Sequence, residues 1–112
     1  MGMDRVVTVL AVQLVPKEVV AAFPRAMVNI HPGFLPTFGG KGFYGERVHK
    51  AVIASGVRFT GPTVHFVDEN YDSGPIIAQR VIPVSPYDDH KHLAARVLKE
   101  VGISVSFTLG LN

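Results

Sequence analysis

The sequence predicts an α/β fold in which helices flank a mostly parallel sheet. Residues 6–15 form a continuous run of mainly apolar residues, many of them β-branched, as expected of a strand buried on both faces. Pro16 occupies a tolerated first-turn position before a short predicted helix, Lys17–Ala22, and Pro24 ends that helix. Met27–Ile30 is a second short strand. Strand, helix and strand joined by short links are typical of two parallel strands with a crossover helix.

Composition limits the classes of protein that the chain can represent. Its 112 residues allow one domain at most, which we take to span residues 1–112. Hydrophobic residues make up 47% and charged residues 18%, a globular balance, and the lack of cysteine excludes disulfides, zinc–thiolate sites and thiol nucleophiles. The net charge is only +2, and no apolar run is long enough to cross a bilayer. We therefore expect neither nucleic acid nor a membrane as a partner.

The loop of residues 31–42 is rich in proline and glycine and directly follows the second predicted strand. It should therefore lie at the carboxyl end of the sheet, where open α/β sheets bind their ligands. Gly39, Gly40 and Gly42 lack the spacing of a P-loop. They indicate either a flexible loop or backbone N–H groups that help to hold an anionic substrate.

Four more elements are predicted in the rest of the chain. They are an amphipathic helix, two strands around a polar turn, and a second helix: Gly45–Ser55, Thr63–Val67, Ile76–Val84 and His90–Val101. Gly56 is expected to end the first of these helices, and Asp88 and Asp89 to cap the second. Residues 101–112 change abruptly to β-branched, glycine and serine residues, and we predict no element for this divergent tail.

Asn29 and His31 are the strongest candidates for chemistry. They are two residues apart at the end of a predicted strand, so their side chains share one face. Acyl transfer needs an amide-type donor for the developing oxyanion and a group that moves protons near neutral pH, and this pair supplies both. Pro32 restricts His31 to extended geometry. Asp72, in a tight turn, could approach His31 across the sheet.

The other histidines have simpler interpretations. We expect His65 to be a satisfied, half-buried strand residue and His49 to lie on a helix surface. His90 and His92 should be solvated near a helix start. Because no histidine pair has the spacing of metal ligands on a predicted element, we expect no metal.

Three stretches resemble the phosphoribosylglycinamide formyltransferase family of purine synthesis. They are residues 29–38, which begin Asn-Ile-His-Pro, residues 61–67, and residues 71–79, which begin Tyr-Asp-Ser-Gly-Pro. Residues 39–45 are similar to an insert of the plant and bacterial branch. The resemblance implies a partial formyltransferase fold of Rossmann-like type over roughly residues 9–100.

The resemblance also implies a reaction, the third step of de novo purine synthesis. The amine of glycinamide ribonucleotide attacks the formyl carbon of the cosubstrate 10-formyltetrahydrofolate, without a metal. Asn29 stabilises the oxyanion, His31 is the general acid, and Asp72 tunes His31 and organises the catalytic water. The residues implied for the folate pocket are Gln13, Leu14, Val15, Asp68, Glu69, Asn70 and Tyr71.

Two departures from the family pattern give alternative hypotheses. The chain has no counterpart of the family's N-terminal Gly-Ser-Asn phosphate loop, and Val101-Gly102-Ile103 replaces the end of its last helix. One alternative is a non-catalytic, truncated or alternatively spliced paralogue whose exposed sheet edge would favour homo-oligomers. Formyltetrahydrofolate deformylase and methionyl-tRNA formyltransferase are further alternatives. The expected partners are small molecules, in the cytoplasm or, if a full-length plant precursor carries a transit peptide, in the chloroplast.

Overall fold

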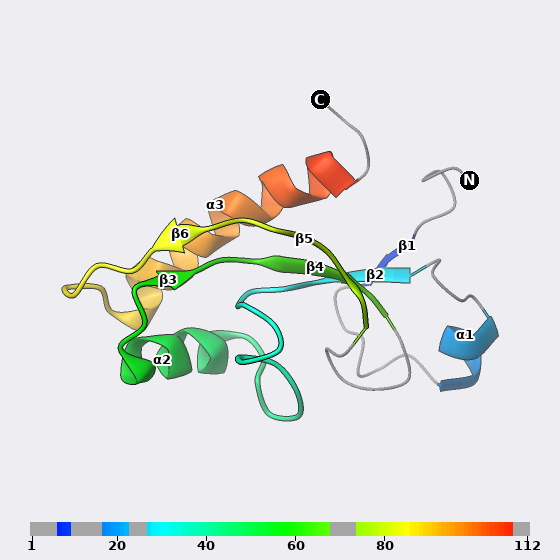
Figure 1. Ribbon diagram of the computed structural model, residues 1–112, viewed down its shortest axis with the longest axis horizontal. Helices are drawn as coiled ribbons and strands as arrows, with labels where there is room; N and C mark the ends of the chain where they lie inside the picture. Colours follow the sequence, from blue (N-terminus) through cyan, green and yellow to red (C-terminus); the bar gives the residue numbers. More distant parts are fainter. Residues whose placement is uncertain (1–6, 10–16, 23–26, 68–73, 109–112) are drawn as a thin grey trace.

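The computed structural model describes residues 7–9, 17–22, 27–67 and 74–108, and Figure 1 shows their arrangement. The elements are β1 (Val7–Val9), α1 (Lys17–Ala22), β2 (Met27–His31), α2 (Glu46–Ser55), β3 (Phe59–Thr60), β4 (Thr63–Phe66), β5 (Ile76–Gln79), β6 (Ile82–Pro83) and α3 (His90–Thr108). Strands β3 and β6, helix α2 and the start of α3 gather at one end of the molecule, while β1 and α1 lie at the other. None of the helices among these residues is long and apolar enough to cross a membrane.

The central sheet has the strand order β1-β2-β4-β5. Strands β1 and β2 are parallel, as predicted for a strand–helix–strand unit around α1. The pairs β2–β4 and β4–β5 are antiparallel, however, so the predicted α/β class is confirmed but the sheet is not mostly parallel where it is described. The short connection explains why β5 runs antiparallel to β4. Only nine residues join the two strands, too few for the crossover that parallel strands need.

The predicted strand Ile76–Val84 is two strands in the structure. It is interrupted after β5, and β6 leaves the main sheet to pair antiparallel with β3, an element that the sequence did not predict. Gly61, between β3 and β4, has φ 152°, and a Cβ there would lie 1.7 Å from the carbonyl oxygen of Arg80. The close crossing of these two chain segments therefore requires glycine at this position.

The helices begin and end largely where local signals predict. Helix α1 has the predicted bounds, and α2 ends at Ser55, followed by the predicted stop Gly56, which is left-handed with φ 73°. Helix α3 begins at His90, and the Asp89 carboxylate accepts a hydrogen bond from the backbone N–H of His92 at 2.8 Å, as expected of a cap. It continues to Thr108, which corrects the prediction for residues 101–108. Without proline in that stretch, each β-branched residue costs an established helix less than about 1 kcal/mol.

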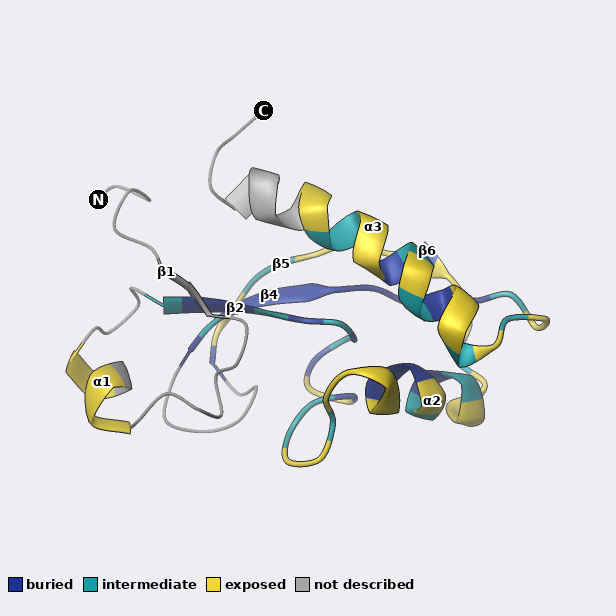
Figure 2. Cartoon of the chain, turned by 180° about the vertical axis from the view of Figure 1, so that it is seen from behind, coloured by how far each residue is buried: buried dark blue, intermediate teal, exposed yellow. Residues whose placement is uncertain are grey.

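A hydrophobic core joins α2, α3, β6 and the loop after β2. Both helices alternate buried and exposed residues in Figure 2, as amphipathic helices do. The buried members of the core are Phe38, Val48, Val52, Ile82, Val84, Leu93 and Val97. The helix residues among them are spaced by four, so each helix presents one apolar stripe to the core.

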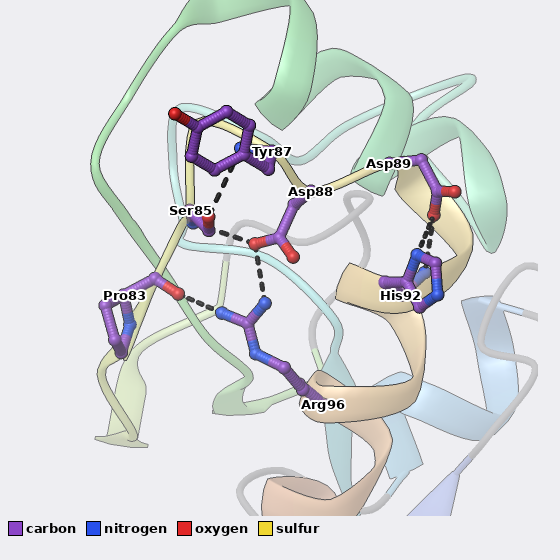
Figure 3. A network of polar contacts seen from close by, with 7 residues as sticks. All are labelled: Pro83, Ser85, Tyr87, Asp88, Asp89, His92 and Arg96. Carbon is purple, nitrogen blue, oxygen red and sulfur yellow. Dashed lines mark hydrogen bonds and ion pairs between the residues drawn. The ribbon is translucent and has the colours of Figure 1, made fainter.

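A polar network fixes the start of α3 against β6 (Figure 3). The Asp88 carboxylate accepts hydrogen bonds from the backbone N–H of Ser85 at 2.8 Å and from Nη1 of Arg96 at 2.5 Å. Nη2 of Arg96 donates to the carbonyl oxygen of Pro83. The hydrogen bond from Arg96 is the main reason why the pKa of Asp88 lies below its ordinary value of 3.8.

Candidate active site

Strand β2 places Asn29 and His31 on one buried face, as the sequence predicts. The neighbouring strand β4 runs antiparallel to it, in a register that sets His65 opposite Asn29 and Thr63 opposite His31. Side chains directly opposite each other on paired strands are close neighbours on the same face. The two candidates therefore lie against two polar residues of β4.

His65 is more deeply buried than predicted, with only 1% of its surface exposed, and it contacts the candidate site. Its Nδ1 lies 3.0 Å from the carbonyl oxygen of Phe66, which can only accept, so Nδ1 carries the proton. Its Nε2 then accepts a hydrogen bond from Nδ2 of Asn29 at 3.4 Å. This contact orients the Asn29 amide. The alternation of β4 places Thr63 and His65 on one face, but the sequence does not indicate which strand they meet.

The loop after β2 folds back onto His31. Nε2 of His31 donates a hydrogen bond to the carbonyl oxygen of Phe38, whose own N–H donates to the carbonyl oxygen of Phe34 at 2.9 Å. Because the Phe38 carbonyl only accepts, Nε2 keeps its proton and Nδ1 is the ring atom that can exchange one. The loop packs so closely that a Cβ on Gly33 would lie 2.6 Å from Cγ1 of Val48.

His49 lies in the interior and not on the helix surface, which corrects its predicted place. Only 5% of its surface is exposed, because it borders the apolar stripe that Val48 and Val52 turn toward the core. Its Nδ1 has no hydrogen-bond partner among the described residues. Burial is the largest cause that lowers the pKa of His49 from its ordinary 6.5, and nearby His31 and His90 lower it further. These effects favour the neutral imidazole.

The other predicted site residues lie outside the described residues, and their roles stay predictions. They are Asp72 and the pocket residues Gln13, Leu14, Val15, Asp68, Glu69, Asn70 and Tyr71. Within the described ranges, no three histidine, aspartate or glutamate side chains form a group that could hold a metal.

A buried amide and a buried histidine on one face of a strand supply two groups that acyl transfer can use, a donor for the oxyanion and a carrier of protons. The chain belongs to the formyl transferase family, whose model matches residues 1–106. It is 64% identical to the chloroplastic phosphoribosylglycinamide formyltransferase of Vigna unguiculata over 88 residues. These residues cover 79% of this chain and 28% of that protein. The Arabidopsis thaliana protein of the same name is 52% identical over 99 residues, covering 88% of this chain and 34% of that protein.

Two further relatives extend the comparison. Formyltetrahydrofolate deformylase of Escherichia coli K12 is 38% identical over 96 residues, which cover 86% of this chain and 31% of that protein. The crystal structure of glycinamide ribonucleotide transformylase 1 from Symbiobacterium toebii matches with a TM-score of 0.76 and 36% identity, covering 86% of this chain and 43% of that one. The chain thus spans about a third of the length of the curated relatives it matches.

Proposed function

We propose that this chain transfers the formyl group of 10-formyltetrahydrofolate to the amine of glycinamide ribonucleotide. The observation that carries the proposal is the buried pair Asn29 and His31 on one face of β2, with the Asn29 amide oriented by His65. Relatives named phosphoribosylglycinamide formyltransferase at 64% and 52% identity support this choice of substrate.

The chemistry assigns one role to each side chain. The substrate amine attacks the formyl carbon, and the carbonyl oxygen becomes an oxyanion. Nδ2 of Asn29 has two N–H groups, of which one meets His65, and we assign the other to the oxyanion. When the tetrahedral intermediate collapses, the bond from the formyl carbon to the folate nitrogen breaks. The His31 imidazolium gives that leaving nitrogen its proton, and the proton that the attacking amine loses returns to the His31 imidazole.

The remaining parts of the proposal concern residues outside the described ranges and the setting of the reaction. Asp72 would tune His31 and order the catalytic water, and residues 13–15 and 68–71 would line the folate pocket. The partners would be small molecules. The plant relatives are named chloroplastic, and we propose a plastid location for this chain as well. A homo-oligomer through a sheet edge remains a further proposal.

The test is an assay that measures formylglycinamide ribonucleotide and free formate separately, with 10-formyltetrahydrofolate as donor. We expect amine formylation by the wild type and a loss of about 10²-fold or more in kcat for His31→Ala. His92→Ala, at an exposed histidine of α3, is the matched control and should retain full activity.

Three outcomes would contradict the proposal. Equal amine formylation by the wild type and His31→Ala would remove the assigned role of His31. Formate release without a formylated amine would instead indicate a hydrolase, the reaction named for the Escherichia coli relative, and no turnover at all would indicate the non-catalytic alternative.

A further inference from the structure

Thr63 holds together three segments beside the candidate site. It is the residue of β4 opposite His31 and is fully buried, with 0% of its surface exposed. Its hydroxyl donates to the carbonyl oxygen of Gly33 at 2.8 Å and accepts from the backbone N–H of Leu35 at 3.3 Å. It also accepts from Nε2 of Gln79, on β5, at 3.0 Å. A threonine hydroxyl has one donor and two acceptor positions, and all three are used.

The loop that Thr63 holds is the loop that holds His31. Gly33 and Leu35 lie between β2 and Phe38, whose carbonyl oxygen accepts the hydrogen bond from Nε2 of His31. The contact between the Phe38 N–H and the Phe34 carbonyl closes this turn at 2.9 Å. A shift of the loop at Gly33 or Leu35 would therefore move the carbonyl that selects the protonated nitrogen of His31.

We propose that Thr63 is a positioning residue, which holds the loop of residues 33–38 so that the Phe38 carbonyl fixes the tautomer of His31. Nδ1 of His31 is then kept as the ring atom that takes and gives the proton. The catalytic part of this inference rests on the proposed function, in which His31 is the general acid. The positioning part concerns the geometry of the free protein and can be measured without turnover.

The chain offers a matched control in Thr60. It is a threonine in strand β3, which precedes β4 in the chain, and is equally buried, with 0% exposed, but its hydroxyl has no hydrogen-bond partner among the described residues. Valine at either position keeps the shape of the side chain and removes the hydroxyl. At position 63 the change leaves a buried carbonyl and a buried N–H without their partner, whereas at position 60 it removes a group that was already unpaired.

The experiment compares Thr63→Val, Thr63→Ser and Thr60→Val by hydrogen exchange and by ¹⁵N NMR of the His31 ring. For Thr63→Val we expect exchange of the Leu35 amide to be faster by about tenfold or more, as loss of one buried hydrogen bond would give. The His31 ring should change from the Nε2–H tautomer to a mixture. Thr63→Ser should restore both readouts, and Thr60→Val should match the wild type.

Kinetics then separates the two proposals. Thr63→Val should lower kcat by about tenfold with little change in KM, since the substrate contacts are kept and the geometry of the acid is lost. If the wild type lacks transferase activity but Thr63→Val still changes the His31 tautomer, the result would support the positioning role and overturn the proposed function. If Thr63→Val has the same Leu35 exchange rate and the same His31 tautomer as Thr60→Val, the positioning role is overturned.

A second variant keeps the test decisive if Thr63→Val does not fold. Gln79→Met removes the donor on β5 and leaves Thr63 itself in place. We expect it to shift the Leu35 exchange rate and the His31 tautomer in the same direction, by a smaller factor. A folded Gln79→Met protein with both readouts unchanged would contradict the inference.

Discussion

Three histidines of this chain are buried, two of them on paired strands and one on a helix. His31 and His65 lie on the inner faces of paired strands, where hydrogen bonds to backbone carbonyls satisfy one nitrogen of each ring. His49 lies on a helix beside the apolar stripe, and its Nδ1 has no such bond among the described residues. Burying an imidazole without a partner disfavours its charged form. His49 should therefore make the stability of the fold sensitive to pH.

The sign of this effect follows from the lowered pKa of His49. The unfolded chain protonates this side chain near its ordinary pKa of 6.5, and the folded chain does so only at lower pH. Between the two values the unfolded state binds more protons, so stability is complete above pH 6.5 and falls as the pH decreases. We expect His49→Gln to make the decline between about pH 7 and pH 5 less steep, as measured by urea unfolding. His92→Gln, at an exposed position, should keep the wild-type slope, and an unchanged slope in His49→Gln would contradict the assignment.

At the scale of elements, the start of α3 depends on two aspartates with different tasks. Asp89 caps the helix, and Asp88 connects the preceding turn to Arg96, two turns into the helix, and through it to Pro83 of β6. One guanidinium thus joins a helix, a turn and a strand. The contribution of Asp88 needs its negative charge, whereas a cap needs only a side-chain acceptor.

We therefore expect Asp88→Asn to lower the free energy of unfolding at neutral pH by about 1 kcal/mol, a modest value because Arg96 is partly exposed. The pKa of Asp88 is lowered in the folded state, so its contribution is complete above its ordinary pKa of 3.8 and is lost as the pH falls below that value. The difference in the free energy of unfolding between the wild type and Asp88→Asn should therefore become smaller in denaturation curves recorded at decreasing pH. Asp89→Asn is the control, because asparagine caps helices as well as aspartate does. If the wild type stays more stable than Asp88→Asn by the same amount in acid, the stabilisation does not come from the charge of Asp88.

For the whole molecule, local signals predicted the elements and distant contacts decided how they meet. Helix α1, the end of α2 before Gly56 and the start of α3 at His90 follow from proline, glycine and aspartate at the termini. The directions of β4 and β5 and the pairing of β3 with β6 depend on segments that are distant in sequence, and no periodicity encodes them.

The candidate site also has features that local sequence predicts and features that depend on distant contacts. The shared face of Asn29 and His31 follows from the period of a strand. The contact of Asn29 with His65 joins residues 36 positions apart and needs the fold. The burial of His49 was missed for the same reason, because it depends on the packing of α2 against the core and not on the helix itself.

The core that joins the two longer helices should also stabilise the site, because Phe38 belongs to both. Leu93 of α3 is fully buried in this core, while Leu98 of the same helix is 70% exposed. We expect Leu93→Ala to lower the free energy of unfolding by about 2–5 kcal/mol, through lost apolar burial and the cavity that remains. Leu98→Ala makes the same truncation in the same helix, with nearly the same change in helix propensity. Because Leu98 is exposed, it should change the free energy of unfolding by less than about 0.5 kcal/mol. Urea unfolding followed by circular dichroism measures both, and equal losses would mean that α3 is not held by this core. Because the Leu93 cavity adjoins the cluster that contains Phe38, Leu93→Ala should also disturb the tautomer of His31, whereas Leu98→Ala should leave it as in the wild type.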